Sequence, residues 1–321
     1  MISKAEKVDA QIPVAAVVGP TASGKSGLAV ELALRCEGEV VSADSMQIYT
    51  GMSIGTAKPT VDEMRGVPHH LIDFVAPQAS FSVADYVKLA AQCVADIHAR
   101  GKLPILAGGT GLYVRSLLQN LQFTEEDRDD ALRASLKKRA EEEGTQALMD
   151  ELRRIDPESA ARLHPNNLGR VIRALEIYYT TGSTMTQQIE RSRTKPSPYH
   201  VCMIGLDFLD RENLYARINA RVDKMMADGL EEEARQVLGQ RASTARQAIG
   251  YKEWAPYFQG EISREEVAEN IKRETRRYAK RQLTWFRREE NIHWLHVDAY
   301  PDSLGLVSAA QSILDTWRCK D

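Results

Sequence analysis

The sequence predicts an α/β protein in which a parallel sheet is flanked by helices and interrupted by a helical insertion. Short apolar runs at 13–18, 39–43 and 103–107 have the length of buried strands. The first run leads through a glycine-rich turn into 27–35, where apolar residues recur at helical spacing. Alternation of strands and helices is typical of a parallel sheet covered by helices.

Charged, helix-forming sequence divides the chain into two predicted domains. We expect a core formed by residues 1–122 and 200–321, and a helical insertion at 123–199. The apolar run at 201–207 is expected to return to the sheet as a strand. Further helices are expected at 82–100, with Ser82 as the N-terminal cap, and at 211–227, 229–239 and 263–288.

Bulk properties exclude several classes of protein. The chain has 321 residues, 43% of them hydrophobic and 27% charged, and a formal charge of −3. Its four cysteines show no CxxC spacing, so neither a disulfide framework nor a zinc site is indicated. No apolar segment approaches the length of a membrane span, and the N-terminus has no apolar signal region. We therefore expect a soluble, cytoplasmic monomer with no membrane partner.

A segment that matches the pattern GxxxxGK[ST] lies between the first predicted strand and helix. Glycines let backbone N–H groups surround phosphate oxygens, the lysine supplies a cation, and the final hydroxyl can bind Mg²⁺. The segment consists of Gly19, Pro20, Thr21, Ala22, Ser23, Gly24, Lys25 and Ser26. It predicts a P-loop NTPase-like core, for which the default function is a nucleotide-dependent kinase with Ser26 on the metal.

Polar residues follow the next two predicted strands. Asp44 comes at the end of the second strand, at the edge of the sheet where ligands of α/β proteins bind, and is a candidate base or metal ligand. The alternative is an aspartate that only caps a turn. Thr110 follows Gly108 and Gly109 after the third strand, where a P-loop NTPase often has its metal-binding Asp. This departure disfavours nucleotide hydrolysis.

Seven motifs together resemble the tRNA dimethylallyltransferase family over about residues 12–290. They are, in order, GPTASGKS, SADSMQIYTGMSIGTAKP, GVPHHLID, GGTGLY, GRVIRALE, QAIGYKE and TRRYAKRQLTWFR. The resemblance implies that the loop at 19–26 binds the diphosphate of dimethylallyl diphosphate rather than ATP. It also implies that Asp44 is the general base, and that Thr110 and Arg217 support the departing diphosphate with Mg²⁺.

The same resemblance implies contacts to a tRNA anticodon stem-loop. They are Asp44, Ser45, Met46, Gln47, Arg133, Arg170, Arg173, Gln247, Ala248, Ile249, Gly250, Tyr251, Lys252, Arg277 and Arg281. Independently, the segment 272–288 places basic residues on one helix face, with Tyr278, Trp285 and Phe286 between them, as phosphate contact and base stacking require. The alternative is a solvated helix face with aromatic residues in the core.

The expected reaction is transfer of a dimethylallyl group to the exocyclic amine of the adenine 3′-adjacent to the anticodon. Three alternatives stay open: prenyl transfer to free AMP, a P-loop kinase, and a non-catalytic RNA-binding module. His69 and His70 have no third ligand nearby in the sequence, so a structural role is preferred to a metal site. The segment after Asn291 matches no usable pattern.

Overall fold

A computed structural model describes residues 11–123, 129–239 and 244–319. The chain forms two compact units. The first contains Met1–Leu118 and Ser197–Asp321, and the second contains Gln119–Pro196. The sequence predicts the insertion at 123–199.

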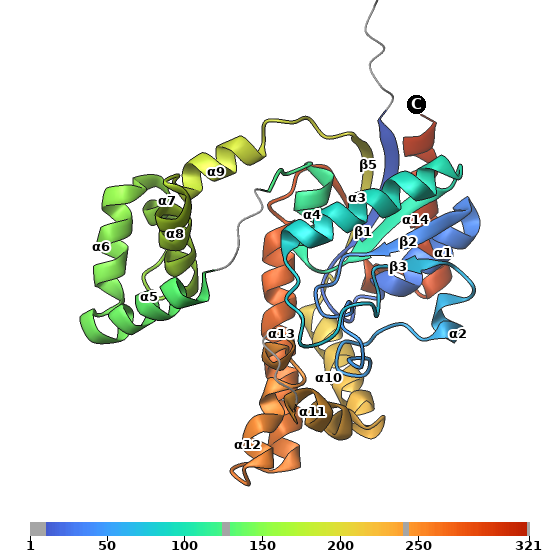
Figure 1. The fold of residues 1–321 in the computed structure, drawn as a ribbon. Coiled ribbons are helices and arrows are strands. Elements are labelled where there is room, and N and C mark those ends of the chain that lie inside the picture. Colours follow the sequence, from blue (N-terminus) through green and yellow to red (C-terminus); the bar gives the residue numbers. More distant parts are fainter. Residues whose placement is uncertain (1–10, 124–128, 240–243, 320–321) are drawn as a thin grey trace, which may run out of the picture. The chain divides into compact units, whose positions relative to one another are not determined.

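The first unit is built on a six-stranded sheet in the order β3-β2-β4-β1-β5-β6 (Figure 1). All of its strand pairs are parallel, which confirms the predicted sheet. The strands are β1 Ile12–Val18, β2 Gly38–Ser42, β3 His69–His70, β4 Leu103–Gly108, β5 Tyr199–Asp207 and β6 Ile292–His296. Because parallel strands end at the same edge, the segments after β1, β2 and β4 meet there.

The helices of this unit number twelve among the described residues, three of them short 3-10 turns. They are α1 Lys25–Cys36, α2 Val61–Met64, α3 Val83–Ala99, α4 Gly111–Leu118, α10 Arg211–Ala227, α11 Leu230–Gly239, η1 Ala245–Gln247, η2 Lys252–Trp254, α12 Ala255–Phe258, α13 Arg264–Phe286, η3 Val297–Ala299 and α14 Ser303–Arg318. No helix within 11–123, 129–239 or 244–319 combines the length and apolarity needed to cross a bilayer.

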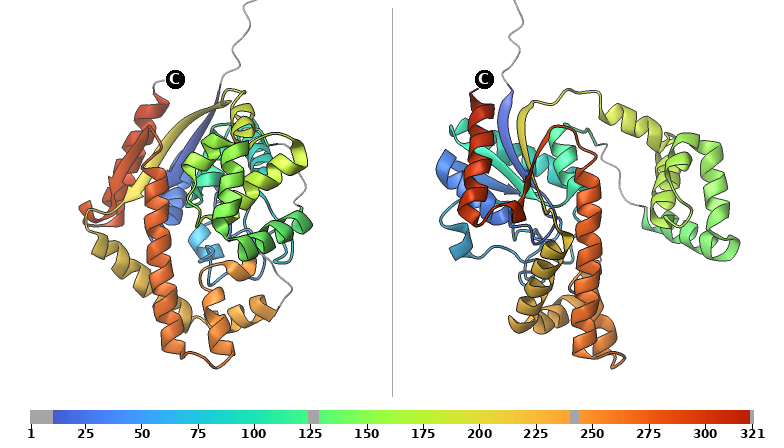
Figure 2. Two further views of the ribbon diagram at one scale, coloured as in Figure 1. Left: turned by 90° about the vertical axis from the view of Figure 1, so that its left-hand side faces the viewer. Right: turned by 180° about the vertical axis from the view of Figure 1, so that it is seen from behind.

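Two apolar clusters cover the two faces of the sheet. On one face α1 and α14 pack against the strands through residues such as Leu32 and Leu314. On the other face α3 and α4 contribute Tyr86 and Leu117, with Phe286 from the end of α13 (Figure 2). The sheet is therefore enclosed between two layers of helices.

Local signals explain where the long helices begin. Ser82 accepts a hydrogen bond from the backbone of Asp85, whose side chain accepts one from the Ser82 backbone, so the predicted cap of α3 is confirmed. Ser263 and Glu266 form the same reciprocal capping box at the start of α13. Such pairs satisfy N–H groups that the first helical turn leaves free.

A third apolar cluster joins α10, α11 and the first part of α13 beyond the carboxyl edge of the sheet. Its largest buried side chains include Tyr251 and Trp254. Farther along, Leu214 and Ile218 of α10 pack against Ala279 and Leu283 of α13. The two helices therefore stand side by side next to the phosphate loop (Figure 2).

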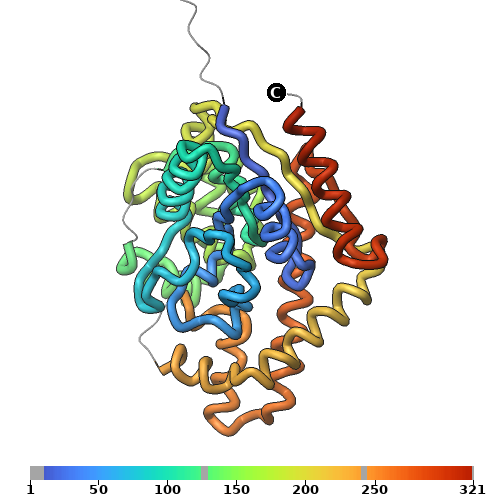
Figure 3. Tube along the Cα trace, turned by 90° about the vertical axis from the view of Figure 1, so that its right-hand side faces the viewer, coloured from blue at the N-terminus to red at the C-terminus, as the bar shows by residue number. Residues whose placement is uncertain are grey.

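The segment after Asn291 adds a strand and a helix to the core, neither of which is among the elements predicted from the sequence. β6 extends the sheet beside β5, and α14 packs on α1 through Leu306, Val307 and Leu314 (Figure 3). β6 is a five-residue edge strand whose side chains are mostly half-buried. Its apolar pattern is too short to identify it without the neighbouring strand.

The second unit is helical in its described part. Its helices are α5 Asp130–Glu143, α6 Thr145–Ile155, α7 Pro157–Arg162, α8 Leu168–Thr181 and α9 Met185–Ser192. They enclose their own apolar cluster, in which Leu148, Leu152, Val171 and Leu175 are fully buried. This unit therefore has a core independent of the sheet.

Candidate active site

The phosphate loop presents unpaired hydrogen-bond donors at the start of α1. Gly24 caps the helix with φ 88°, a left-handed conformation that suits glycine, and no side chain caps the first turn. The Ser23 hydroxyl oxygen is buried and has no partner among the described residues. A helix N-terminus with a buried unpaired hydroxyl beside it is suited to an anion.

Lys25 supplies the cation of this loop. Its Nζ donates to the carbonyl oxygen of Pro20 at 3.3 Å. The pKa of Lys25 is lowered to about 8, chiefly by burial; the carboxylate of Asp44 opposes the shift and the charge of Arg221 adds to it. An anion that binds beside the ammonium group would stabilise its charged form and raise its pKa again.

Two arginines of α10 face the loop, one helical turn apart. Arg217, which the resemblance singles out, donates through Nε to the carbonyl oxygen of Ala22 at 3.0 Å, and its side chain is otherwise exposed. Arg221 is half-buried and interacts electrostatically with both Lys25 and Asp44. Burial lowers the pKa of Arg221. The sequence analysis missed Arg221, although its spacing of four residues from Arg217 was visible.

Asp44 lies just beyond β2 and combines both roles considered for it. Its Oδ1 accepts hydrogen bonds from the backbone N–H groups of Met46 at 2.9 Å and Gln47 at 3.3 Å, so the carboxylate does cap a turn. Oδ2 accepts no hydrogen bond from any residue the structure describes. One oxygen therefore holds the carboxylate in place while the other is free to accept a proton.

Thr110 joins the loop after β4 to the Asp44 turn. Its Oγ1 accepts from the backbone N–H of Ser45 at 3.1 Å, and its own N–H donates to the carbonyl oxygen of Ala43 at 3.1 Å. Burial, and next the nearby Asp44 carboxylate, raise the pKa of Tyr278 on α13 to about 12. The tyrosine therefore lies beside Asp44 and Thr110 as a neutral phenol, a position that the sequence analysis did not foresee.

A glutamine of α13 connects the two glycine-rich loops. Gln282 is buried, accepts at Oε1 from the backbone N–H of Thr21 at 2.8 Å, and donates through Nε2 to the carbonyl oxygen of Gly109 at 2.9 Å. From the sequence, this helix was expected only to present an RNA-binding face. Its buried side includes the residue that sets the distance between the phosphate loop and the Thr110 loop.

Gln47 is 9% exposed and its amide is already oriented by the protein. Nε2 donates to the carbonyl oxygens of Thr56 at 3.2 Å and Ala57 at 3.1 Å. Two acceptors identify the amide nitrogen, because the amide oxygen would be repelled from both. Oε1 accepts no hydrogen bond within the described residues, so Gln47 offers a ligand only an acceptor.

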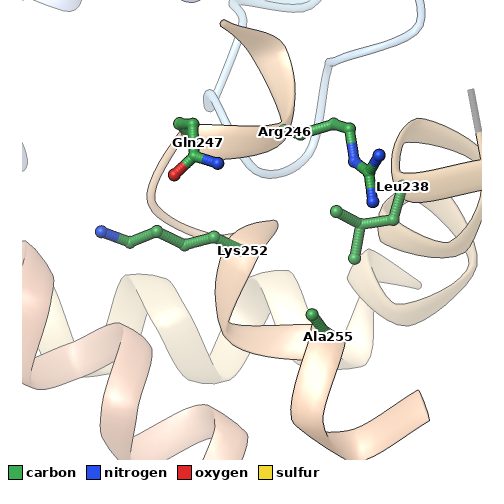
Figure 4. A pocket seen from close by; sticks show the side chains of 5 residues that line it. All are labelled: Leu238, Arg246, Gln247, Lys252 and Ala255. Atoms are coloured by element: carbon green, nitrogen blue, oxygen red, sulfur yellow. The ribbon is translucent and has the colours of Figure 1, made fainter. Parts of the chain in front are cut away.

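The 247–252 segment divides into exposed and buried residues. Gln247 and Lys252 are exposed, and with Leu238, Arg246 and Ala255 they line a cavity of about 500 Å³. Figure 4 shows Gln247 and Lys252 extending to the same side, while Arg246 reaches toward Leu238.

Other expected contacts in this segment need correction. Ala248, Gly250 and Tyr251 are buried, which leaves them a structural rather than a direct RNA-binding role, and Ile249 is half-buried. Ser45 and Met46 are also half-buried and stay in the Asp44 turn. The 247–252 segment is therefore anchored by its buried residues, and only its two terminal polar residues, Gln247 and Lys252, are exposed.

On α13 the expected basic face is exposed, whereas its three aromatic residues are half-buried or buried. Arg277 is exposed and pairs with Glu274 at 2.7 Å, and exposed Arg281 lies over the Tyr278 ring at 5.6 Å. Phe286, in contrast, is fully buried in the core. Trp285 packs so closely that a Cβ on Gly111 would lie 2.1 Å from its indole ring. The expectation of a base-stacking aromatic residue was wrong for Phe286, whereas Trp285 is half-buried.

In the helical unit, two of the three expected RNA contacts are ion-paired. Glu176, which is fully buried, receives Nε and Nη2 of Arg133 at 2.8 Å each and Nη1 of Arg173 at 2.8 Å. Burial disfavours the carboxylate, but hydrogen bonds from the two arginines hold the pKa of Glu176 below its usual value. Arg170 is exposed and forms no ion pair with any described residue.

A divalent cation at Ser26 would find few protein ligands. The hydroxyl is exposed at the N-terminus of α1, and in the ranges the structure describes no three His, Cys, Asp or Glu side chains come together to hold a metal. Mg²⁺ commonly binds through one or two protein oxygens plus phosphate oxygens and water, and Ser26 fits that arrangement. His69 and His70 lie on β3 instead, where His70 Nε2 is 2.8 Å from Glu39 Oε2.

A glycine-rich anion site at the carboxyl edge of a parallel sheet, faced by a carboxylate and two arginines, defines a P-loop-like enzyme fold of the phosphate-binding class. The IPP transferase family model matches residues 47–289. The chain belongs to this family of prenyltransferases, so the resemblance noted in the sequence is confirmed.

Relatives and solved structures agree with this assignment. A tRNA dimethylallyltransferase of Caldanaerobacter subterraneus subsp. tengcongensis is 50% identical, with 90% of this chain and 93% of the relative covered. The crystal structure of a tRNA isopentenylpyrophosphate transferase from Bacillus halodurans has 46% identity and a TM-score of 0.70, covering 96% and 98% of the two chains. A eukaryotic dimethylallyltransferase acting on tRNA has 29% identity and a TM-score of 0.74, covering 89% and 74%.

Proposed function

We propose that this protein transfers the dimethylallyl group of dimethylallyl diphosphate to the exocyclic N6 amine of the adenine 3′-adjacent to the anticodon of tRNA. The observation that carries the proposal is the Asp44 carboxylate beside Lys25 and Arg221 at the phosphate loop. A base and a group of cations at one sheet edge match a reaction that removes a proton and expels an anion. The names of the relatives support the same reaction.

In the proposed step the adenine nitrogen bonds to the allylic carbon as the bond from that carbon to the diphosphate oxygen breaks. Both electrons of the broken bond leave with the diphosphate. The amine proton passes to Oδ2 of Asp44, since Oδ1 is occupied by the turn. Because the proton leaves as the new bond forms, the poorly nucleophilic amine avoids a full positive charge.

Charge on the leaving group is stabilised by groups that are already in place. Lys25, Arg217, Arg221 and the N–H groups at the start of α1 surround the proposed diphosphate position. Thr110 holds the turn that carries Asp44. Donors preorganised around developing negative charge typically contribute several kcal/mol to catalysis. Mg²⁺ bound through Ser26 would neutralise part of the diphosphate charge.

For the tRNA we propose contacts at exposed polar residues only. They are Arg170, Gln247, Lys252, Arg277 and Arg281. The free Oε1 of Gln47 would accept a hydrogen bond from the adenine amine, and it would be repelled by the keto oxygen that guanine carries at the same position. The target base must leave its stack to reach Asp44, which costs less in a loop than in a duplex. Binding of tRNA through arginine and lysine should weaken as the salt concentration rises. We also propose that the reaction takes place in the cytoplasm.

Labelled dimethylallyl diphosphate, Mg²⁺ and unmodified tRNA test the proposal directly. We expect label in tRNA with wild-type protein, and a loss on the order of 100-fold or more in kcat with Asp44→Asn. Asparagine keeps an oxygen to accept from the turn, so the loss would report the missing base. An Asp44→Asn protein with wild-type kcat would remove the base from the mechanism.

Two further arms of the assay separate the alternatives. AMP offered in place of tRNA should stay unlabelled, and ATP should neither be consumed nor compete strongly with the prenyl diphosphate. Turnover of ATP without prenyl transfer would establish a kinase instead. Efficient labelling of AMP would make the protein an adenylate prenyltransferase.

A further inference from the structure

Glu233 of α11 is a carboxylate with four hydrogen-bond donors, none of them from a cationic side chain among the described residues. Oε2 accepts from the backbone N–H groups of Ser53 at 2.8 Å and Ile54 at 2.9 Å. Oε1 accepts from the backbone N–H of Gly55 at 2.9 Å and from the hydroxyl of Tyr251 at 2.7 Å. A single side chain thus binds two segments that are far apart in the sequence.

The three backbone donors are consecutive, and they form a concave set that surrounds the carboxylate. Such nests of successive N–H groups are adapted to hold an anion. The loop is closed on itself just after them, since the N–H of Ala57 donates to Ile54 at 3.0 Å and the N–H of Lys58 to Ser53 at 2.9 Å. Glu233 therefore fixes the position of a compact, internally hydrogen-bonded loop.

Tyr251 joins the second segment to the first. Its ring lies directly on Gly55, where an added Cβ would be 2.6 Å from the ring carbon that bears the hydroxyl. Tyr251 is fully buried, and the adjacent Gly250 approaches the carbonyl oxygen of Gly55. The loop and the 247–252 segment are consequently fixed to each other by packing as well as by Glu233.

The loop in turn orients the residues that face the proposed target base. The carbonyl oxygens of Thr56 and Ala57 accept both hydrogen bonds from the Gln47 amide. The backbone N–H of Gln47 donates to Asp44. A shift of the loop would therefore move the Gln47 amide, and would disturb the turn that holds the Asp44 carboxylate.

We propose that Glu233 is a positioning residue for the nucleobase acceptor. It holds the 53–57 loop and Tyr251 in one arrangement, through which Gln47 and Asp44 meet the amine of the target base, while Gln247 and Lys252 stand at the RNA surface. The inference rests on the proposed function. It assigns Glu233 to the acceptor side of the reaction and to none of the contacts with the diphosphate.

The Glu233→Gln variant tests this assignment with little change of size. The amide would direct an NH₂ group at two of the four donors, so the loop would lose part of its anchor. We expect kcat/KM for tRNA to fall on the order of 100-fold, since small misplacements of reacting groups have effects of that size. The dissociation constant of dimethylallyl diphosphate should stay within about twofold, because none of the four bonds touches the phosphate loop. Glu232→Gln, at an exposed neighbour on the same helix, is the matched control and should resemble wild type.

Hydrogen exchange provides a readout that does not depend on activity. Amides 53–55 should exchange faster in Glu233→Gln than in Glu232→Gln. Tyr251→Phe removes one donor and keeps the ring, so its kcat/KM for tRNA should lie between the values of wild type and Glu233→Gln. This second variant keeps the inference testable if Glu233→Gln folds poorly.

Different results would overturn different claims. If Glu233→Gln leaves kcat/KM for tRNA and the exchange of amides 53–55 unchanged, or weakens only the binding of the prenyl diphosphate, the positioning role is wrong. If wild-type protein does not prenylate tRNA, the proposed function fails, whereas the exchange measurement still decides whether Glu233 holds the loop.

Discussion

The side-chain oxygen of Gln282 accepts a 2.8 Å hydrogen bond from the backbone N–H of Thr21, which lies 261 residues earlier in the chain. The same side chain donates to Gly109 at 2.9 Å. The phosphate loop and the Thr110 loop are thereby held to α13 and to each other. The geometry of the diphosphate site thus depends on a helix that follows both loops by more than a hundred and fifty residues.

We predict that Gln282→Ala disturbs the phosphate loop. The change leaves the Thr21 N–H and the Gly109 carbonyl without their partner, which should cost about 1–3 kcal/mol of the free energy of unfolding. The affinity for dimethylallyl diphosphate should also fall, by about tenfold or more, because the loop loses its anchor. Denaturant unfolding and isothermal titration measure the two effects. Gln236→Ala, at an exposed position of α11, is the control, and equal behaviour of the two variants would contradict the role of Gln282.

Arg221 should contribute more to catalysis than Arg217. Both lie near the loop, but Arg221 is half-buried and interacts with Lys25 and Asp44, whereas Arg217 is largely in solvent. Charge stabilisation is stronger where water is excluded, so Arg221→Ala should lower kcat on the order of 100-fold and Arg217→Ala by less. Steady-state kinetics with saturating tRNA provides the comparison. A larger effect of Arg217→Ala would reverse the order that burial predicts.

Binding of the diphosphate should weaken above about pH 8. Burial lowers the pKa of Lys25 to about 8, so in the free protein the ammonium form predominates below this pH and is lost as pH rises through it. If the anion binds only the charged form, the dissociation constant rises about tenfold per pH unit beyond that point. Titration calorimetry of wild type and Lys25→Arg tests this, because a guanidinium does not titrate in the same range. A wild-type profile that is flat across pH 8 would contradict it.

Glu39 should stabilise the fold at neutral pH. It is 1% exposed, and hydrogen bonds from Arg100, His70 and Lys102 lower its pKa from 4.5 to about 2 against the cost of burial. Because the folded pKa is depressed, the stabilisation is complete above about pH 4.5 and is lost as pH falls toward 2. We expect about 2 kcal/mol, since Arg100 and Lys102 are partly exposed and screened by water.

Urea unfolding of wild type and Glu39→Gln at several acidic and neutral pH values measures this contribution. The difference in the free energy of unfolding between the two proteins should shrink as pH falls below about 4.5. A difference that stays constant with pH would mean that glutamine fails for steric reasons, not through loss of charge.

Features encoded over short stretches could be predicted from the sequence. The strand, turn and helix around the phosphate loop follow from a contiguous pattern, and the capping of α3 by Ser82 depends on residues three apart. The parallel sheet followed from the alternation of strands and helices. β6 was missed because an edge strand acquires its identity only from the strand beside it. α14 was missed although Leu306, Ala310 and Leu314 recur at helical spacing.

At the site, the residue types were visible in the sequence but their partners were not. Arg133 and Arg173 read as exposed cations, yet they neutralise the buried Glu176. Phe286 was expected to stack on a base, yet it lies on the side of α13 that packs into the core. A charged or aromatic residue on a helix carries no local mark of the side that will be buried, since this depends on what packs against the helix.

The sequence by itself determined the anion-binding loop, the parallel sheet and the membership of the family, because each shows in short contiguous motifs, whether one motif or several along the chain. Only the tertiary structure decided which arginine of α10 lies inside, that Gln282 ties the two glycine-rich loops together, and that Glu233 anchors the 53–57 loop. The reason is physical. Hydrogen bonds and burial are set by distances in space, and these contacts join residues separated by more than a hundred and seventy positions.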